Sequence, residues 1–213
     1  MALTNLDEIL HRHELWLRSE KDGQRAILKD IDLSGIDLKN RDLRGVDFRH
    51  SNLEDANFNK ANLKAAYFDG AILYRANLHE TNLINARFVM ANLERADLSS
   101  AHANRANFYK ANLRYSNLYE CDLKESILKG ADLRGADLIG ADIRGAELYS
   151  SAWPLDIGTT DVCVDIWFVY QLLAHVLCLR CNDPEFETIK DLIRPYALKS
   201  HKAPELGLRE EDE

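Results

Sequence analysis

A five-residue period runs without interruption through residues 26–150. Counting from Leu28 to Leu148, every fifth position is a large apolar residue in 24 of 25 repeats, and Ala103 is the exception. The residue two positions before each of these centres is small, usually Ala, and the residue between them is Asp or Asn in 18 of the 25 repeats. A helix repeats every 3.6 residues and a strand every two, so neither keeps a five-residue pattern on one face. The chain is therefore predicted to turn at every repeat and to point both the centre and the small residue inward.

Four such turns close a square coil of 20 residues, and the 25 repeats give slightly more than six coils. Successive coils are expected to stack at about 4.8 Å, the spacing between neighbouring strands. No Pro occurs between residues 26 and 150, as expected if the backbone N–H groups bond to neighbouring coils. Residues 20 apart then share a column, and four phenylalanines are predicted to stack inside one column: Phe48, Phe68, Phe88 and Phe108.

The runs "ANLERADL", "ANLRYSNL" and "GADLRGADLIGADI" resemble the A(D/N)LxX motif of the pentapeptide-repeat family. The resemblance covers residues 26 to about 150. It implies a right-handed quadrilateral β-helix. The predicted fold class is therefore an all-β solenoid with an N-terminal capping helix and a C-terminal pair of α-helices.

The chain is expected to divide into four segments: a capping helix in residues 1–25, the β-helix in 26–153, a helical cap and dimerisation segment in 154–200, and a loose acidic tail in 201–213. The first helix is predicted over residues 4–22, with Thr4 as its N-cap and Gly23 ending it. The apolar residues of this helix follow helical spacing and are expected to cover the first coil: Leu6, Ile9, Leu10, His13, Trp16 and Leu17.

Two C-terminal helices are predicted, from Asp161 to about Cys181 and from Asp183–Pro184 onward. The first is apolar nearly all round, so it is expected to be buried on more than one side. Together they carry more apolar surface than one cap needs, which predicts a homodimer through this region. The residues predicted to form the dimer contact are Trp167, Phe168, Tyr170, Leu173 and Leu177.

Large or charged residues replace Asp or Asn at several outward positions near the phenylalanine column. Tyr67 and Arg87 are two of them. Val89 and Tyr109 stand at the neighbouring outward position, with Met90 next, and these five residues form a predicted partner-binding face. The alternative is ordinary variation of an exposed surface.

The sequence contains no convincing set of metal ligands or catalytic residues. His175, Cys178 and Cys181 have helical spacing, but a structural zinc needs four ligands, and Cys163 lies about 27 Å away along a straight helix. Nothing marks Ser99 or Ser100, near His102, as an activated serine. The glycines at 130, 135, 140 and 145 occupy turn positions and form no phosphate-binding loop. We therefore expect no metal, no cofactor and no enzymatic activity.

Four carboxylates recur at five-residue spacing in "GADLRGADLIGADIRGAEL", residues 130–148. In a square coil they lie on consecutive faces and point away from one another: Asp132, Asp137, Asp142 and Glu147. This arrangement argues against a shared metal site or an acid–base pair.

Charge and cysteine content favour a cytoplasmic protein. The net charge of −8 argues against direct binding to nucleic acid or to an anionic membrane. The N-terminus has acidic residues where a signal peptide needs a basic start, and four cysteines are too few for a disulfide framework in a chain of 213 residues. The apolar stretch 162–179 contains Asp165, Gln171 and His175, so we expect a buried helix there and no membrane span.

The leading functional hypothesis is a non-catalytic, rigid protein-interaction module with an unidentified protein partner. The family resemblance offers an alternative, because some members protect DNA gyrase by resembling duplex DNA in size and charge. Residues 26–150 carry 17 Lys and Arg against 18 Asp and Glu, whereas duplex DNA carries one negative charge about every 1.7 Å. A DNA-mimicking modulator of a type II topoisomerase is therefore the second hypothesis.

Overall fold

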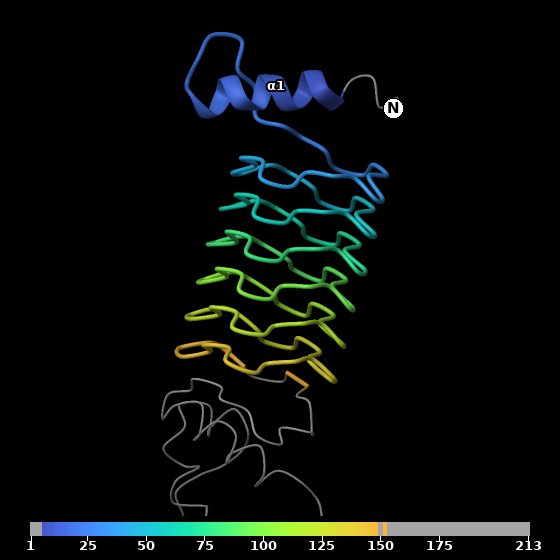
Figure 1. Cartoon of the computed structure of the whole chain (residues 1–213), viewed down its shortest axis with the longest axis vertical. Helices are drawn as coiled ribbons and strands as arrows, with labels where there is room; N and C mark the ends of the chain where they lie inside the picture. The colour runs from blue at the N-terminus through green and yellow to red at the C-terminus, as the bar shows by residue number, and fades with distance from the viewer. Residues whose placement is uncertain (1–5, 149–150, 153–213) are drawn as a thin grey trace, which may run out of the picture. The chain divides into compact units, whose positions relative to one another are not determined.

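The computed structural model describes residues 6–148 and 151–152, all within the compact unit Met1–Cys163. It contains one helix, α1 (Leu6–Leu17), followed by a stack of coils (Figure 1). Isolated parallel bridges replace continuous strands, and each joins residues 20 apart, from Ile27 with Asp47 to Asp132 with Ala152. The predicted 20-residue coil and solenoid architecture are therefore confirmed.

Each repeat can satisfy all five of its backbone N–H groups, and residues 91–95 show how. Ala91 N–H closes the preceding turn on Phe88 O (N···O 3.1 Å), Asn92 N–H bonds to Ala71 O in the previous coil (2.9 Å), and Leu93 and Arg95 N–H bond to Asn112 O and Arg114 O in the next coil (2.7 and 2.9 Å). The fifth, Glu94 N–H, donates to the side-chain Oδ1 of Asn92 (3.1 Å). Because such a repeat uses every N–H, proline has no place in it.

The Asp or Asn of the repeat serves its own turn. At all 18 Asp and Asn positions of the motif, Oδ1 accepts the backbone N–H two residues later. Asparagine adds bonds between coils, for example from Asn112 Nδ2 to Asn92 Oδ1 (3.0 Å). Asp or Asn therefore closes each of these 18 turns, and asparagine can also link neighbouring coils.

The last residue of each repeat adopts a left-handed backbone. From Asp30 to Gly145 these turn residues have φ between 52° and 73°, and most are not glycine. A left-handed conformation costs a non-glycine residue about 1–2 kcal/mol, so the bonds between coils must offset that cost at every such corner.

The phenylalanine column forms a continuous internal stack, as predicted. Centroids of successive rings lie 5.1, 4.8 and 4.9 Å apart from Phe48 to Phe108, with interplanar angles of 14°, 2° and 4°. Phe58 approaches from the opposite wall and meets Phe48 and Phe68 edge-on. All five rings are fully buried.

Helix α1 ends five residues earlier than predicted. It stops at Leu17 because Ser19 takes a left-handed φ of 58°, while Ser19 N–H bonds to Trp16 O and Glu20 N–H to Leu15 O. These two bonds form a Schellman motif, which usually has glycine at the left-handed position. The expectation that Gly23 ends the helix was therefore wrong, and the predicted N-cap, Thr4, lies outside the described residues.

Helix α1 contacts the first coil through buried Leu10 and His13. The backbone N–H of Ala26 donates to His13 Nδ1 (3.2 Å), and Glu14 pairs with Arg41 (3.2 Å). Trp16 was expected on the buried face, but it remains 41% exposed and stacks on the His13 ring. The centre of this contact is therefore an imidazole that accepts a backbone hydrogen bond.

Stability is expected to fall as the pH drops below about 6.5. Burial lowers the pKa of His13 below its usual 6.5, despite nearby Asp42, and a protonated Nδ1 could not accept the Ala26 N–H. In the unfolded chain His13 binds a proton near pH 6.5, whereas in the folded chain it does so only at lower pH, so acid favours unfolding by up to about 1.4 kcal/mol per pH unit.

Urea unfolding of wild type and His13→Asn at pH 7.5 and 5.5 measures this effect. Asn offers an acceptor but does not titrate, so it should lose less stability on acidification. Equal losses for the two proteins would contradict the assignment to His13.

The predicted C-terminal helices lie outside the described residues, as do the proposed dimer contacts Trp167, Phe168, Tyr170, Leu173 and Leu177 and the stretch 162–179. Within the part that the structure describes, no helix has the length and hydropathy of a membrane span.

Candidate functional site

The predicted partner-binding face lies over the phenylalanine column and the corner that follows it. Met90 is 65% exposed, Arg87 is exposed, and Tyr67, Val89 and Tyr109 are half-buried. Their backbone is held by bonds to neighbouring coils, so these side chains extend from a fixed wall.

Tyr67 is surrounded by arginines. The guanidinium carbons of Arg25, Arg49 and Arg87 lie 5.6, 6.0 and 6.0 Å from the centroid of its ring. Cations at this distance from an aromatic ring are attracted to it by about 0.5–1 kcal/mol at exposed sites. The structure therefore places Tyr67 and Arg87 together and adds Arg49 from the previous coil and Arg25 from just before the first coil.

Asp69 links Arg87 to Val89. One oxygen, Oδ2, pairs with Arg87 Nε (3.2 Å), and the other, Oδ1, accepts the backbone N–H of Val89 (3.1 Å). In an ordinary repeat the Asp or Asn at position 87 would accept that N–H. Asp69 thus replaces the missing turn acceptor from one coil away and fixes the arginine that displaced it.

Asp47 neutralises the charge of Arg49, a second arginine near Tyr67. Its buried carboxylate pairs with Arg49 (2.6 Å), and the hydrogen bond from this guanidinium lowers the pKa of Asp47. Arg25, Arg49 and Arg87 therefore stand against Asp47 and Asp69, so this group of five residues carries one excess positive charge.

The remaining predicted residues form the adjacent corner. Met90 N–H donates to Tyr109 O (2.8 Å), and Lys110 Nζ lies 5.2 Å from the centroid of the Tyr109 ring. The structure thus joins Tyr67 with Arg87, and Met90 with Tyr109, while Asp69 connects Arg87 to Val89.

Sequence reasoning missed Arg25, Arg49 and Asp69. A signal was available, because Asp69 and Arg87 are 18 residues apart, as are Arg49 and Tyr67. A separation of 18 residues is two short of a full coil. It brings a corner residue beside the outward Asp or Asn position of the next coil. A column of residues 20 apart does not contain these pairs.

Two of the four acidic residues in 130–148, Asp132 and Asp142, form ion pairs within their own turns. Arg134 Nε bonds to Asp132 Oδ1 (2.8 Å) and Arg144 Nε to Asp142 Oδ1 (2.9 Å). The bond from Arg144 lowers the pKa of Asp142 to about 2. No cluster of potential metal ligands occurs among the described residues, and the candidates His175, Cys178 and Cys181 lie outside them.

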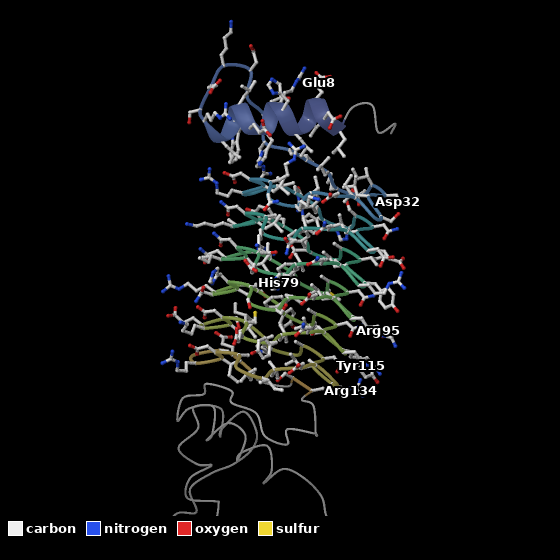
Figure 2. The ribbon with its side chains drawn as sticks, in the orientation of Figure 1. Glu8, Asp32, His79, Arg95, Tyr115 and Arg134 are labelled. Atoms are coloured by element: carbon white, nitrogen blue, oxygen red, sulfur yellow. The ribbon has the colours of Figure 1, made fainter. Side chains whose placement is uncertain are left out.

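A serine, a histidine and an aspartate do meet at another corner, in a combination that the sequence did not reveal. His79 Nδ1 lies 2.8 Å from Ser99 Oγ, which donates to Asp97 Oδ1 (2.6 Å); Figure 2 labels His79. The serine hydroxyl hydrogen is directed to Asp97. His79 Nδ1 also lies 3.0 Å from the carbonyl oxygen of Ser99, which can only accept, so both contacts favour a donor nitrogen and not a base. Ser99 is also buried. This arrangement holds the corner together and does not activate a nucleophile.

Cys121 offers no nucleophile either. Its thiol lies fully inside the coil, and burial raises its pKa well above the usual value. The reactive thiolate form is therefore disfavoured.

A family model described as pentapeptide repeats matches the chain in four overlapping segments, residues 26–64, 61–99, 91–130 and 116–151, with 8 copies. No curated protein sequence matches.

Solved structures also match. HetL from Nostoc sp. strain PCC 7120, a pentapeptide repeat protein involved in heterocyst differentiation regulation, is 29% identical over 65% of this chain and 69% of its own, with a TM-score of 0.24. Rfr23 from Cyanothece 51142 is 25% identical over 70% and 99%, with a TM-score of 0.33. QnrB1, a plasmid-mediated fluoroquinolone resistance protein, is 21% identical over 72% and 98%, with a TM-score of 0.34.

Proposed function

The chain belongs to the pentapeptide-repeat family, and on that basis we propose that it is a non-catalytic module that binds a protein partner through Tyr67, Arg87, Val89, Met90 and Tyr109. The observation that carries the proposal is the setting of Tyr67, whose ring is within 6.0 Å of three guanidinium groups on a rigid wall. Tyrosine and arginine are the residue types most enriched at the energetic centres of protein interfaces.

The rigidity of the wall favours binding. Asp69 and Asp47 already fix two of the arginines, so little side-chain entropy remains to be lost when a partner docks. Met90 supplies exposed apolar area beside them, and methionine adapts to irregular partner surfaces.

We expect Arg87→Glu combined with Tyr109→Ala to reduce partner capture at least about tenfold. Each change removes a side chain of the face, and the new carboxylate lies beside Asp69 and repels it. The measurement is affinity purification of the tagged full-length chain from its native cells, with quantitative mass spectrometry.

Arg105→Glu combined with Tyr119→Ala is the matched control. Arg105 is also ion-paired, with Glu125, and Tyr119 is an exposed tyrosine, but both lie at other corners. Equal capture by wild type and the Arg87→Glu, Tyr109→Ala variant would rule out this face.

The second hypothesis, a DNA-mimicking modulator of a type II topoisomerase, has less support. A DNA mimic needs a continuous negative surface, whereas arginines neutralise Asp42, Asp47, Asp132 and Asp142 within their own turns. A gyrase supercoiling assay with excess protein distinguishes the two hypotheses.

The proposal also assigns capping roles to the segments at the two ends of the solenoid. In this scheme α1 caps the first coil, since Leu10 and His13 are buried there, and segment 154–200 caps the last coil and forms a homodimer. Light scattering that shows only monomer at high concentration would contradict the dimer. The composition of the chain supports a cytoplasmic location.

A further inference from the structure

One corner of the solenoid carries a row of arginines and tyrosines. Four successive coils place there Tyr74 and Arg75, then Arg95, then Arg114 and Tyr115, then Arg134. Figure 2 labels Arg95, Tyr115 and Arg134, which follow one another along the same edge of the stacked coils.

The two outer arginines are occupied. Arg75 Nε bonds to Asp55 Oδ1 (2.8 Å), and Arg134 Nε bonds to Asp132 Oδ1 (2.8 Å). These pairs hold their guanidinium groups in fixed positions and cancel their charges.

The two inner arginines, Arg95 and Arg114, have no such ion pairs with other described residues. Among the described residues no carboxylate pairs with Arg95 or Arg114, and the nearby carboxylate of Glu94 accepts a hydrogen bond from Asn112 (3.1 Å). Arg95 bonds only weakly to the hydroxyl of Tyr74 (3.5 Å). The Nε of Arg114 is buried and has no hydrogen-bond partner. This nitrogen is therefore desolvated without a hydrogen bond. Asp132 attracts Arg114 electrostatically but forms its ion pair with Arg134, and a partly desolvated guanidinium attracts an anion more strongly than an exposed one does.

The guanidinium groups of Arg95 and Arg114 both lie within reach of the ring of Tyr115. Their carbons lie 6.0 Å (Arg95) and 5.4 Å (Arg114) from the centroid of its ring. The ring lies over Gly135 in the next coil, where a Cβ would come within 2.5 Å of Tyr115 Cδ1. Glycine at position 135 thus leaves room for the ring in this position.

We propose that Arg95, Arg114 and Tyr115 form a binding site for a glutamate or aspartate side chain in an acidic segment of a partner protein. The planar guanidinium fork matches a carboxylate with two parallel hydrogen bonds. The site is separate from the Tyr67 face and goes beyond the function proposed for that face.

A peptide fits the site better than a nucleic acid does. Among the described residues of this corner, only two guanidinium groups have no ion pair, and Glu94 and Asp132 flank them. A phosphate backbone binds tightly through many such contacts, whereas this corner offers two. Two forks suit one or two carboxylates.

Fluorescence anisotropy of a labelled hexaglutamate peptide with the full chain tests the site. We expect wild type to bind and the Arg95→Gln, Arg114→Gln variant to bind at least about tenfold more weakly. The Arg95→Lys, Arg114→Lys variant keeps the charge but loses the fork, and it should bind at least about threefold more weakly.

Arg44→Gln combined with Arg144→Gln changes the net charge equally at another corner and should bind within about twofold of wild type. The Arg87→Glu, Tyr109→Ala variant should also bind normally, so that a failure of the Tyr67 face is distinguishable from a failure of this site. Circular dichroism confirms that each variant folds.

Four results would overturn the proposal. They are no binding by wild type, full binding by the lysine variant, equal loss in the Arg44, Arg144 control, and stronger competition by a hexathymidine oligonucleotide than by unlabelled hexaglutamate.

Discussion

Replacing Phe88 with alanine is expected to lower the free energy of unfolding by about 3–5 kcal/mol. The ring is fully buried, and its centroid lies 4.8 Å from that of Phe68 and 4.9 Å from that of Phe108. The substitution removes two stacking contacts and leaves a cavity that a rigid coil cannot close. Urea unfolding followed by far-ultraviolet circular dichroism measures the loss.

Two further variants serve as comparisons for Phe88→Ala. Phe88→Leu retains most of the buried volume and should cost less than Phe88→Ala, as leucine already occupies the same column at position 128. Ile72→Ala removes an apolar side chain that is 45% exposed, and it should cost no more than about 1 kcal/mol. If Phe88→Ala cost no more than Ile72→Ala, the ring stack would not stabilise the coil as argued here.

The phenylalanine stack could be predicted because it depends only on the period. Once five residues make one wall and four walls make one coil, residues 48, 68, 88 and 108 must share a column. The left-handed corners and the Asp or Asn turns follow from the same repetition. Their geometry is set by the backbone, which every repeat has in common.

The candidate sites are formed by long side chains, and the five-residue period does not predict which neighbours those side chains contact. Arg49 leans toward Tyr67 in the next coil, Asp69 pairs with Arg87, and His79 reaches Ser99. The end of α1 was missed for a related reason, since Ser19 takes a left-handed conformation that usually indicates glycine. These contacts and conformations depend on the local surroundings of each residue, and the repeat pattern, which treats equivalent positions alike, does not predict them.

A series at Asn92 is expected to show what the repeat requires of its Asp or Asn position. Asn92→Pro should cost about 4 kcal/mol or more, because it removes the N–H bond to Ala71 O and the side-chain acceptor used by Glu94 N–H and Asn112 Nδ2. Asn92→Ala loses only the two bonds to the side chain and should cost about 1–3 kcal/mol. Urea unfolding again gives the values, with Asn104→Ala, which changes a corner residue elsewhere in the same coil, as the control.

Asn92→Asp is the informative member of the series, because aspartate keeps the acceptor oxygen and adds a charge. We expect it to change stability by less than about 0.5 kcal/mol, since Asp97 already accepts an asparagine Nδ2 from the next coil, that of Asn117 (3.1 Å). If aspartate were as costly as alanine, the carboxylates of "GADLRGADLIGADIRGAEL" would need an explanation beyond the turn. If aspartate and asparagine are equivalent, the oxygen is what the turn selects, and the acidic residues at 132, 137 and 142 build the wall without forming a site.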